Sequence, residues 1–331
     1  MQHERLARTR SKLLTAILLT ASLWCALAIY YSDLLDGRAR LIATLLFLGF
    51  GFWATLSRHD LPKWMLWLAI VAIVGGWVFR QPSNDRQWRP EVAVAPSAVI
   101  DGDRIRFTGV RDFSYRSADD FTVRYIDREV RLSQLESVDY FISYWTQPPG
   151  MVAHTFVSFN FKDAEPLAVS IETRPEVGES FDPIGSMFKK FELIYIVGTE
   201  QDLIGVRVNQ RGESLFGYHL RLRQGMARDL FMVYVKRINE LAGKPEFYHL
   251  LSNNCTLNIF RYANRAGRNG DFDFRHLLNG WSDRYLYDAN LLSTSMPFVE
   301  LRRRSQLNEA VRRGGNKPLF SAWIRETMPP P

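Results

Sequence analysis

Three apolar stretches open the chain, and they constrain its fold more than any other feature. They cover Leu13–Tyr31, Leu41–Ser57 and Trp64–Phe79, and none of them contains a charged residue. As a helix, each is about long enough to cross a hydrocarbon core of about 30 Å. The sequence therefore predicts a membrane anchor of three transmembrane helices over residues 1–80, with the lipid bilayer as a partner.

The orientation of this anchor follows from the basic residues at its N-terminus. Arg5, Arg8, Arg10 and Lys12 lie directly before the first apolar stretch. Basic residues beside a first span favour the cytoplasmic side. Because the number of predicted spans is odd, the chain after Arg80 should lie on the opposite side of the membrane.

Composition excludes several kinds of protein and site. The net charge of +7 is moderate, and the 42 Lys and Arg residues are scattered along the chain, which argues against a nucleic-acid binder. Of the two cysteines, Cys25 lies inside an apolar stretch, so neither a disulfide with Cys255 nor a thiolate zinc site is expected. We find no Gly-rich phosphate loop and no HExxH motif, and we expect no metal and no cofactor.

The remainder of the chain predicts a linker and one α+β domain. Residues 81–98 are polar and carry three prolines, which is typical of a linker, and the domain should occupy residues 99–331. Alternating residues predict strands at Ile105–Val110, Phe121–Arg131, Val152–Phe161, Leu167–Thr173 and Phe191–Val197, whereas Leu132–Tyr144 fits either strand or helix. Helices are predicted at Asp229–Leu241, Cys255–Ala266 and within Glu300–Arg313.

Cys255 is the main candidate for a catalytic residue. It lies at the start of a predicted helix, with Asn253 or Asn254 as the N-cap. The helix dipole and the free N–H groups of the first turn favour the thiolate, which is the reactive form of cysteine. The alternative is an inert, buried thiol, because free cysteine is often a small core residue.

His154 is the candidate base for this thiol. It lies in a predicted hairpin whose turn is centred near Asp163, and that register places Glu172 opposite it. Glu172 could orient the imidazole or pair with Arg174. His249 is an alternative base. A cysteine, a histidine and a carboxylate together suit acyl transfer through a thioester.

Several blocks of the sequence resemble the family named for the N-terminal periplasmic domain of a bacterial lipoprotein N-acyltransferase (Lnb). The resemblance covers most of Val99 to about Pro297, and the order of the blocks makes it more specific than any one of them. The blocks are Arg111–Arg116, Ala153–Phe159, Ser170–Arg174, Phe191–Tyr195 and Asn254–Thr256.

This resemblance implies a fold and a function. The family is similar to circularly permuted papain-like proteins, such as NlpC-type peptidases, which suggests an antiparallel sheet packed with helices. It implies Cys255 as nucleophile, His154 as base and, less directly, Glu172 as the third group. The implied protein is a multi-pass protein of the bacterial inner membrane with its C-terminal domain in the periplasm, acting on a phospholipid or lipoprotein acyl group. A cell-wall peptidase or amidase with the same dyad, and a non-catalytic envelope interaction protein, are the alternatives.

Overall fold

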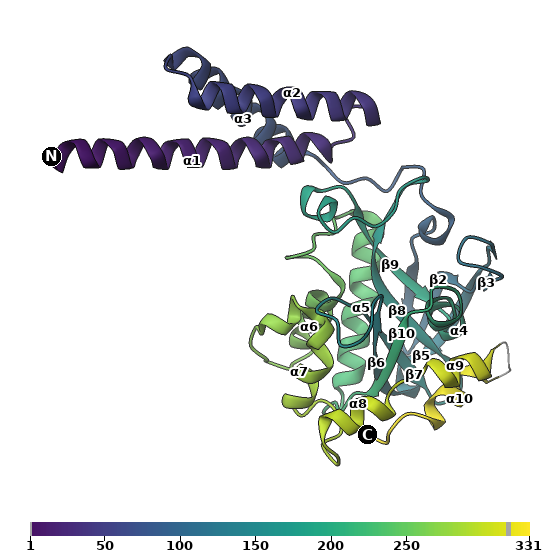
Figure 1. The fold of residues 1–331 in the computed structure, drawn as a ribbon. Helices are drawn as coiled ribbons and strands as arrows, with labels where there is room; N and C mark the ends of the chain where they lie inside the picture. Colours follow the sequence, from purple (N-terminus) through teal and green to yellow (C-terminus); the bar gives the residue numbers. More distant parts are fainter. Residues whose placement is uncertain (1, 316–318) are drawn as a thin grey trace. The chain divides into compact units, whose positions relative to one another are not determined.

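The structure is a computed structural model that describes residues 2–315 and 319–331 (Figure 1). The side chains of residues 2–8, 10 and 11 lie outside the described part, so Arg5, Arg8 and Arg10, which set the predicted orientation, are not placed. The chain forms two compact units. Residues 1–83 and 182–191 make up the first unit, and residues 84–181 and 192–331 make up the second.

The first unit contains three long apolar helices. They are α1 (Gln2–Tyr30), α2 (Gly37–Leu56) and α3 (Asp60–Phe79). Each is long and apolar enough to cross a membrane, as the sequence predicts. Cys25 is fully buried among the apolar side chains that pack between them.

The segment Asp182–Phe191 also belongs to this unit, and we call it the docking segment. Phe188 is 5% exposed, and its ring lies 5.7 Å from the rings of both Trp24 and Tyr31. The Lys189 ammonium donates to the carbonyls of Trp77 and Val78, at 2.9 and 3.0 Å. A cation is favourable at these carbonyls because the C-terminal end of a helix, here α3, carries negative partial charge.

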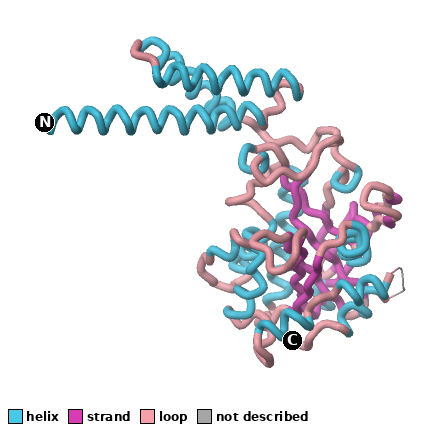
Figure 2. The backbone as a smooth tube through the Cα atoms, in the orientation of Figure 1, coloured by secondary structure: helices cyan, strands magenta, loops and turns pink. Residues whose placement is uncertain are grey.

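The strands, magenta in Figure 2, lie in the second unit. Its main sheet has the strand order β1-β2-β9-β8-β7-β6-β10, and β5 pairs with the other side of β2. A short pair, β3 and β4, forms a separate ribbon. The strands are β1 (Ser97–Asp101), β2 (Arg104–Arg111), β3 (Ser114–Tyr115), β4 (Phe121–Thr122), β5 (Tyr125–Arg131), β6 (Leu135–Tyr144), β7 (His154–Phe161), β8 (Ala164–Arg174), β9 (Glu192–Gly198) and β10 (Ser214–His219).

Helices cover both faces of this sheet (Figure 1). Side chains alternate between the two faces along a strand, so on β7 Val157 and Phe159 join the core with α5 and α6, whereas Phe156 joins the core with α4, α9 and α10. Both faces are therefore apolar and buried. The helices are α4 (Glu200–Gly205), α5 (Met226–Gly243), α6 (Cys255–Arg265), α7 (Ser282–Asp288), α8 (Phe298–Arg304), α9 (Asn308–Gly314) and α10 (Phe320–Glu326), and a π-helix (Val206–Gln210) follows α4.

The expected antiparallel sheet is wrong at one pair of strands. β2 and β9 run parallel and meet at a single bridge, Arg111 with Gly198, so the sheet is mixed. Four sheet strands, β5 to β8, lie between these two in the sequence. A connection of that length leaves the relative direction of the two strands open, unlike a tight hairpin.

Two further predictions differ from the structure. The single helix within Glu300–Arg313 is wrong, because the chain breaks at Ser305, whose carbonyl accepts from the N–H of Gly217 at the edge of β10. The predicted linker 81–98 packs on the domain from Asn84 onward. There the Arg174 guanidinium lies 4.4 Å from the Trp88 ring and donates to the Val92 carbonyl at 2.9 Å.

Candidate active site

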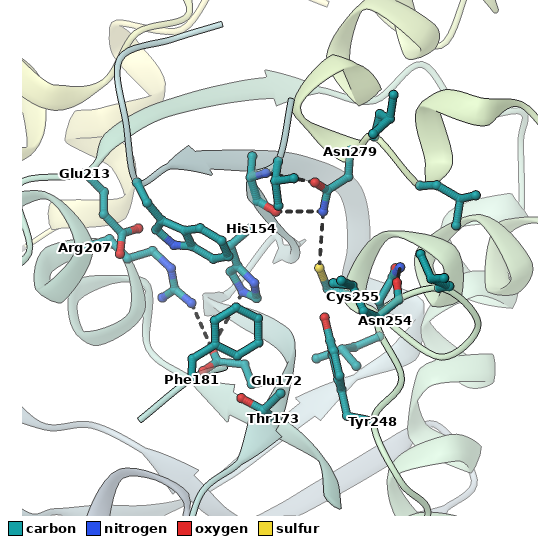
Figure 3. Close-up of a pocket in the computed structure, with 18 of the residues that line it drawn as sticks. His154, Glu172, Thr173, Phe181, Arg207, Glu213, Tyr248, Asn254, Cys255 and Asn279 are labelled. Atoms are coloured by element: carbon teal, nitrogen blue, oxygen red, sulfur yellow. Dashed lines mark hydrogen bonds and ion pairs between the residues drawn. The ribbon is translucent and has the colours of Figure 1, made fainter. Parts of the chain in front are cut away.

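A cavity of about 310 Å³ opens beside the first residue of α6 (Figure 3). It brings together the start of β7, the end of β8, the π-helix and the loop before α7. Its wall combines charged and apolar side chains, and it contains all three residues selected from the sequence. The lining residues are Trp145, Val152, Ala153, His154, Ile171, Glu172, Thr173, Phe181, Arg207, Arg211, Glu213, Tyr248, Leu250, Leu251, Asn254, Cys255, Leu277, Leu278 and Asn279.

Cys255 is the first residue of α6, and a side-chain cap fixes this start. The side-chain oxygen of Asn254 accepts from the N–H of Leu257 at 2.8 Å, and its amide donates to the Leu250 carbonyl at 2.5 Å. Asn254 is therefore the N-cap, which settles the choice that the sequence left open. Asn253 instead donates to the Phe247 carbonyl at 2.9 Å.

His154 is the first residue of β7, and the predicted hairpin register is confirmed. Phe156 pairs with Ser170, so the same register places His154 opposite Glu172. The contact between them is indirect. His154 Nε2 lies 2.7 Å from the Ser170 hydroxyl, which donates to Glu172 Oε1 at 2.8 Å, whereas His154 Nε2 and Glu172 Oε1 are 3.7 Å apart. Ser170 thus connects the histidine to the carboxylate.

Glu172 is held by Arg207 rather than by Arg174. Arg207 lies on the π-helix, its side chain is 3% exposed, and it donates to Glu172 Oε1 at 2.8 Å. Burial alone would raise the pKa of Glu172, but the charges of Arg207 and His154 outweigh burial and hold that pKa well below its usual range. Glu172 is therefore ionised and can accept hydrogen bonds at neutral pH.

The environment of Cys255 favours the thiolate. Burial raises the pKa of the thiol, but the hydrogen bond and charge of His154 outweigh it and, with hydrogen bonds from Thr155 and Thr256, lower the pKa from 9.0 to about 6. The Asn279 amide nitrogen lies 3.8 Å from the sulfur. The fold therefore brings the predicted cysteine, which is buried, and the predicted histidine, which is partly exposed, to the same cavity.

Residues 121–282 match the model of the Lnb N-terminal periplasmic domain family. This segment belongs to that family. No curated protein and no solved structure matches the chain. The family and the three apolar helices together indicate a membrane-anchored protein with a periplasmic domain. The matched segment of this chain includes His154, Glu172 and Cys255.

Asn279 also lines the cavity, and it was not predicted from the sequence. Its side chain bonds both backbone groups of Ala153, accepting from the N–H at 2.8 Å and donating to the carbonyl at 2.7 Å. It also donates to the Thr256 hydroxyl at 3.0 Å. Asn279 therefore joins the residue before His154 to the residue after Cys255.

Tyr248 is the other residue that the sequence did not select. It lines the cavity with Cys255, and burial raises the pKa of its hydroxyl well above the usual value, so the hydroxyl stays protonated. The sequence analysis selected the adjacent residue, His249, as an alternative base. His154 is the only histidine among the described residues that line the cavity, and His249 accepts from the N–H of Leu251 at 3.3 Å.

A metal site is not evident in the described part of the chain. Within residues 2–315 and 319–331, no group of three or more His, Cys, Asp or Glu side chains is arranged to hold a metal ion.

Proposed function

We propose that this chain is a thiol acyltransferase or hydrolase that acts on a lipid or lipoprotein acyl group through a thioester on Cys255. The observation that carries the proposal is that Cys255 and His154 line the same cavity and that His154 lowers the pKa of the thiol to about 6 despite the burial of the sulfur. The resemblance to permuted papain-like enzymes supports the same roles. It also supports a multi-pass location in the bacterial inner membrane, with the enzyme domain in the periplasm.

The reaction begins with the thiolate of Cys255 and the protonated imidazole of His154. The sulfur attacks the carbonyl carbon of an ester, and a C–S bond forms as the carbonyl π electrons move to oxygen. When this oxyanion collapses, the C–O bond breaks and the leaving alcohol takes the proton from His154. An amine or water then attacks the thioester, His154 removes its proton, and the thiolate of Cys255 leaves.

Two donors are available for the oxyanion. One is the backbone N–H of Cys255, at the N-terminal end of α6, and the other is the protonated hydroxyl of Tyr248. Both residues line the cavity (Figure 3). An oxyanion placed beside the sulfur would accept hydrogen bonds from both, which stabilises the tetrahedral intermediate.

The lining of the cavity favours an acyl chain over a peptide. Beside its charged side chains, the wall has an apolar part formed by Val152, Leu250, Leu251, Leu277 and Leu278. An apolar wall binds alkyl groups by excluding water, whereas a cell-wall peptide would need polar partners along its backbone. A cell-wall peptidase or amidase is the second candidate. A non-catalytic envelope protein is less favoured, because the thiol borders a cavity and is paired with His154.

Alkylation of Cys255 by iodoacetamide between pH 5 and 9, followed by peptide mapping, tests the pair in the detergent-solubilised full chain. With a pKa of about 6, about three quarters of the thiol is ionised at pH 6.5. Without His154 the pKa should return to about 9 or above, which lowers the ionised fraction by roughly 240-fold, partly offset by a roughly 16- to 32-fold more nucleophilic thiolate.

We therefore expect His154→Ala to react about tenfold more slowly than wild type at pH 6.5. His249→Ala is the matched control and should react as the wild type does. Equal rates for wild type and His154→Ala across this pH range would refute the pair.

A further inference from the structure

We propose that the apolar rim of the cavity inserts into the surface of the lipid bilayer, so that an acyl chain enters the cavity without crossing water. We define the rim as Trp145, Met151, Val152, Phe181 and Leu251. This inference rests on the proposed function, because it names the bilayer as the source of the substrate. It adds an interaction surface that the reaction itself does not require.

The rim consists of exposed apolar side chains. Met151 is 61% exposed, Leu251 54% and Trp145 48%. Trp145, Val152, Phe181 and Leu251 line the cavity itself, and Met151 directly precedes Val152. The rings of Trp145 and Phe181 lie 5.7 Å apart. Exposed apolar side chains that gather at one place mark a surface that contacts another apolar phase or partner.

The kinds of side chain in the rim fit a bilayer surface. Tryptophan is enriched at the boundary between hydrocarbon and water, where an aromatic body and a polar N–H are both satisfied. The other four rim residues have no charge and would enter the hydrocarbon without desolvating one. The rim thus combines an interfacial aromatic with groups suited to acyl chains.

One rim residue is joined directly to the unit that contains the predicted spans. Phe181 is bonded to Asp182, the first residue of the docking segment, which packs with the ends of α1 and α3 inside the first unit. Residues 80–83 separate the end of α3 from Asn84, and the five steps from Phe79 to Asn84 reach at most about 18 Å when extended. A bilayer is therefore the apolar phase available to the rim.

Nitroxide labelling of the full chain in phosphatidylethanolamine and phosphatidylglycerol nanodiscs tests this contact. The native thiols are replaced by Cys25→Ala and Cys255→Ser, and one cysteine is introduced by Met151→Cys, Phe181→Cys or Leu251→Cys. Val99→Cys is the matched control, since Val99 is a 66% exposed apolar residue on β1 that does not line the cavity. Collision with oxygen and with a water-soluble nickel chelate is measured for each label.

We expect the rim labels to show a several-fold higher ratio of oxygen to nickel collisions than the Val99 label, because oxygen concentrates in hydrocarbon and the chelate is excluded from it. A ratio equal to that of the Val99 label would overturn the proposal. Protection from both reagents would also overturn it, since a protein partner or second copy would then cover the rim.

The two proposals fail separately. If the rim labels are exposed to water and Cys255 is reactive in the wild-type chain, the proposed membrane contact is refuted and the proposed thiol chemistry is not. If the rim labels lie in the membrane and Cys255 is unreactive, the proposed function is refuted instead.

Discussion

Ser170→Ala is the substitution that most sharply tests how the histidine is held. The Ser170 hydroxyl lies between the imidazole and the carboxylate, 2.7 Å from His154 Nε2 and 2.8 Å from Glu172 Oε1. Without it, Nε2 faces a carboxylate oxygen 3.7 Å away, which is beyond hydrogen-bond distance. The imidazolium then loses its nearest acceptor.

The size of the effect follows from the charge on the ring. A hydrogen bond to a charged group is worth about 1.5–3 kcal/mol, and 1.36 kcal/mol corresponds to one pKa unit. The variant should therefore raise the thiol pKa from about 6 by roughly one to two units. The thiol pKa rises rather than falls because a less stable imidazolium at His154 stabilises the thiolate of Cys255 less.

The assay is the pH profile of Cys255 alkylation, whose midpoint should move from about pH 6 toward pH 7–8. Ser158→Ala is the matched control. Ser158 is also fully buried, and its hydroxyl has no hydrogen-bond partner among the described residues. Glu172→Gln would be a poorer test, because it leaves the 3% exposed Arg207 without its ionic partner and costs stability. An unchanged midpoint in Ser170→Ala would refute the connecting role.

Two further substitutions test the fold around the cavity and the sheet. Asn279→Ala removes both hydrogen bonds to the Ala153 backbone; leaving two buried groups unpaired should lower the free energy of unfolding by about 2–4 kcal/mol, measured by denaturant unfolding, and a loss below about 0.5 kcal/mol would contradict this. Arg325→Met leaves the nearly unexposed Glu200 without its cation and leaves Asp139, also nearly unexposed, with His219 as its remaining ionic partner; the substitution should cost about 3–5 kcal/mol at neutral pH. Burial would raise the pKa of Asp139, but the hydrogen bond of His219 and the charge of Arg325 lower it in the folded domain. The stabilisation from the ionised carboxylate is therefore present above the unfolded pKa of about 3.9 and is lost as the pH falls below it. The difference in the free energy of unfolding between wild type and Arg325→Met should narrow as the pH falls toward 3. A difference in the free energy of unfolding that widens as the pH falls would contradict this prediction.

Local patterns predicted the parts of the site that depend on neighbouring residues. Two-residue periodicity marked β7 and β8, and the turn near Asp163 fixed their register, so His154 was correctly placed opposite Glu172. A capping asparagine before an amphipathic segment marked the start of α6, and therefore the environment of Cys255. These features depend on short-range geometry, which a single sequence carries.

Contacts between distant segments could not be predicted in this way. Arg207 reaches Glu172 from 35 residues away, and Asn279 bonds Ala153 from 126 residues away. Ser170 was inside a predicted strand, but its role depends on a 2.7 Å distance to a ring on the neighbouring strand. The parallel pairing of β2 and β9 is likewise set by the packing of the whole sheet rather than by either strand.

The most direct test of the account is intact-mass analysis of the full chain after incubation in phospholipid nanodiscs and quenching in acid. The account predicts that the wild-type chain gains the mass of one acyl group, that peptide mapping places it on Cys255, that hydroxylamine removes it, and that Cys255→Ala does not acquire it. A wild-type chain that carries no acyl group on Cys255, or an adduct that persists at another residue in Cys255→Ala, would contradict the thioester mechanism.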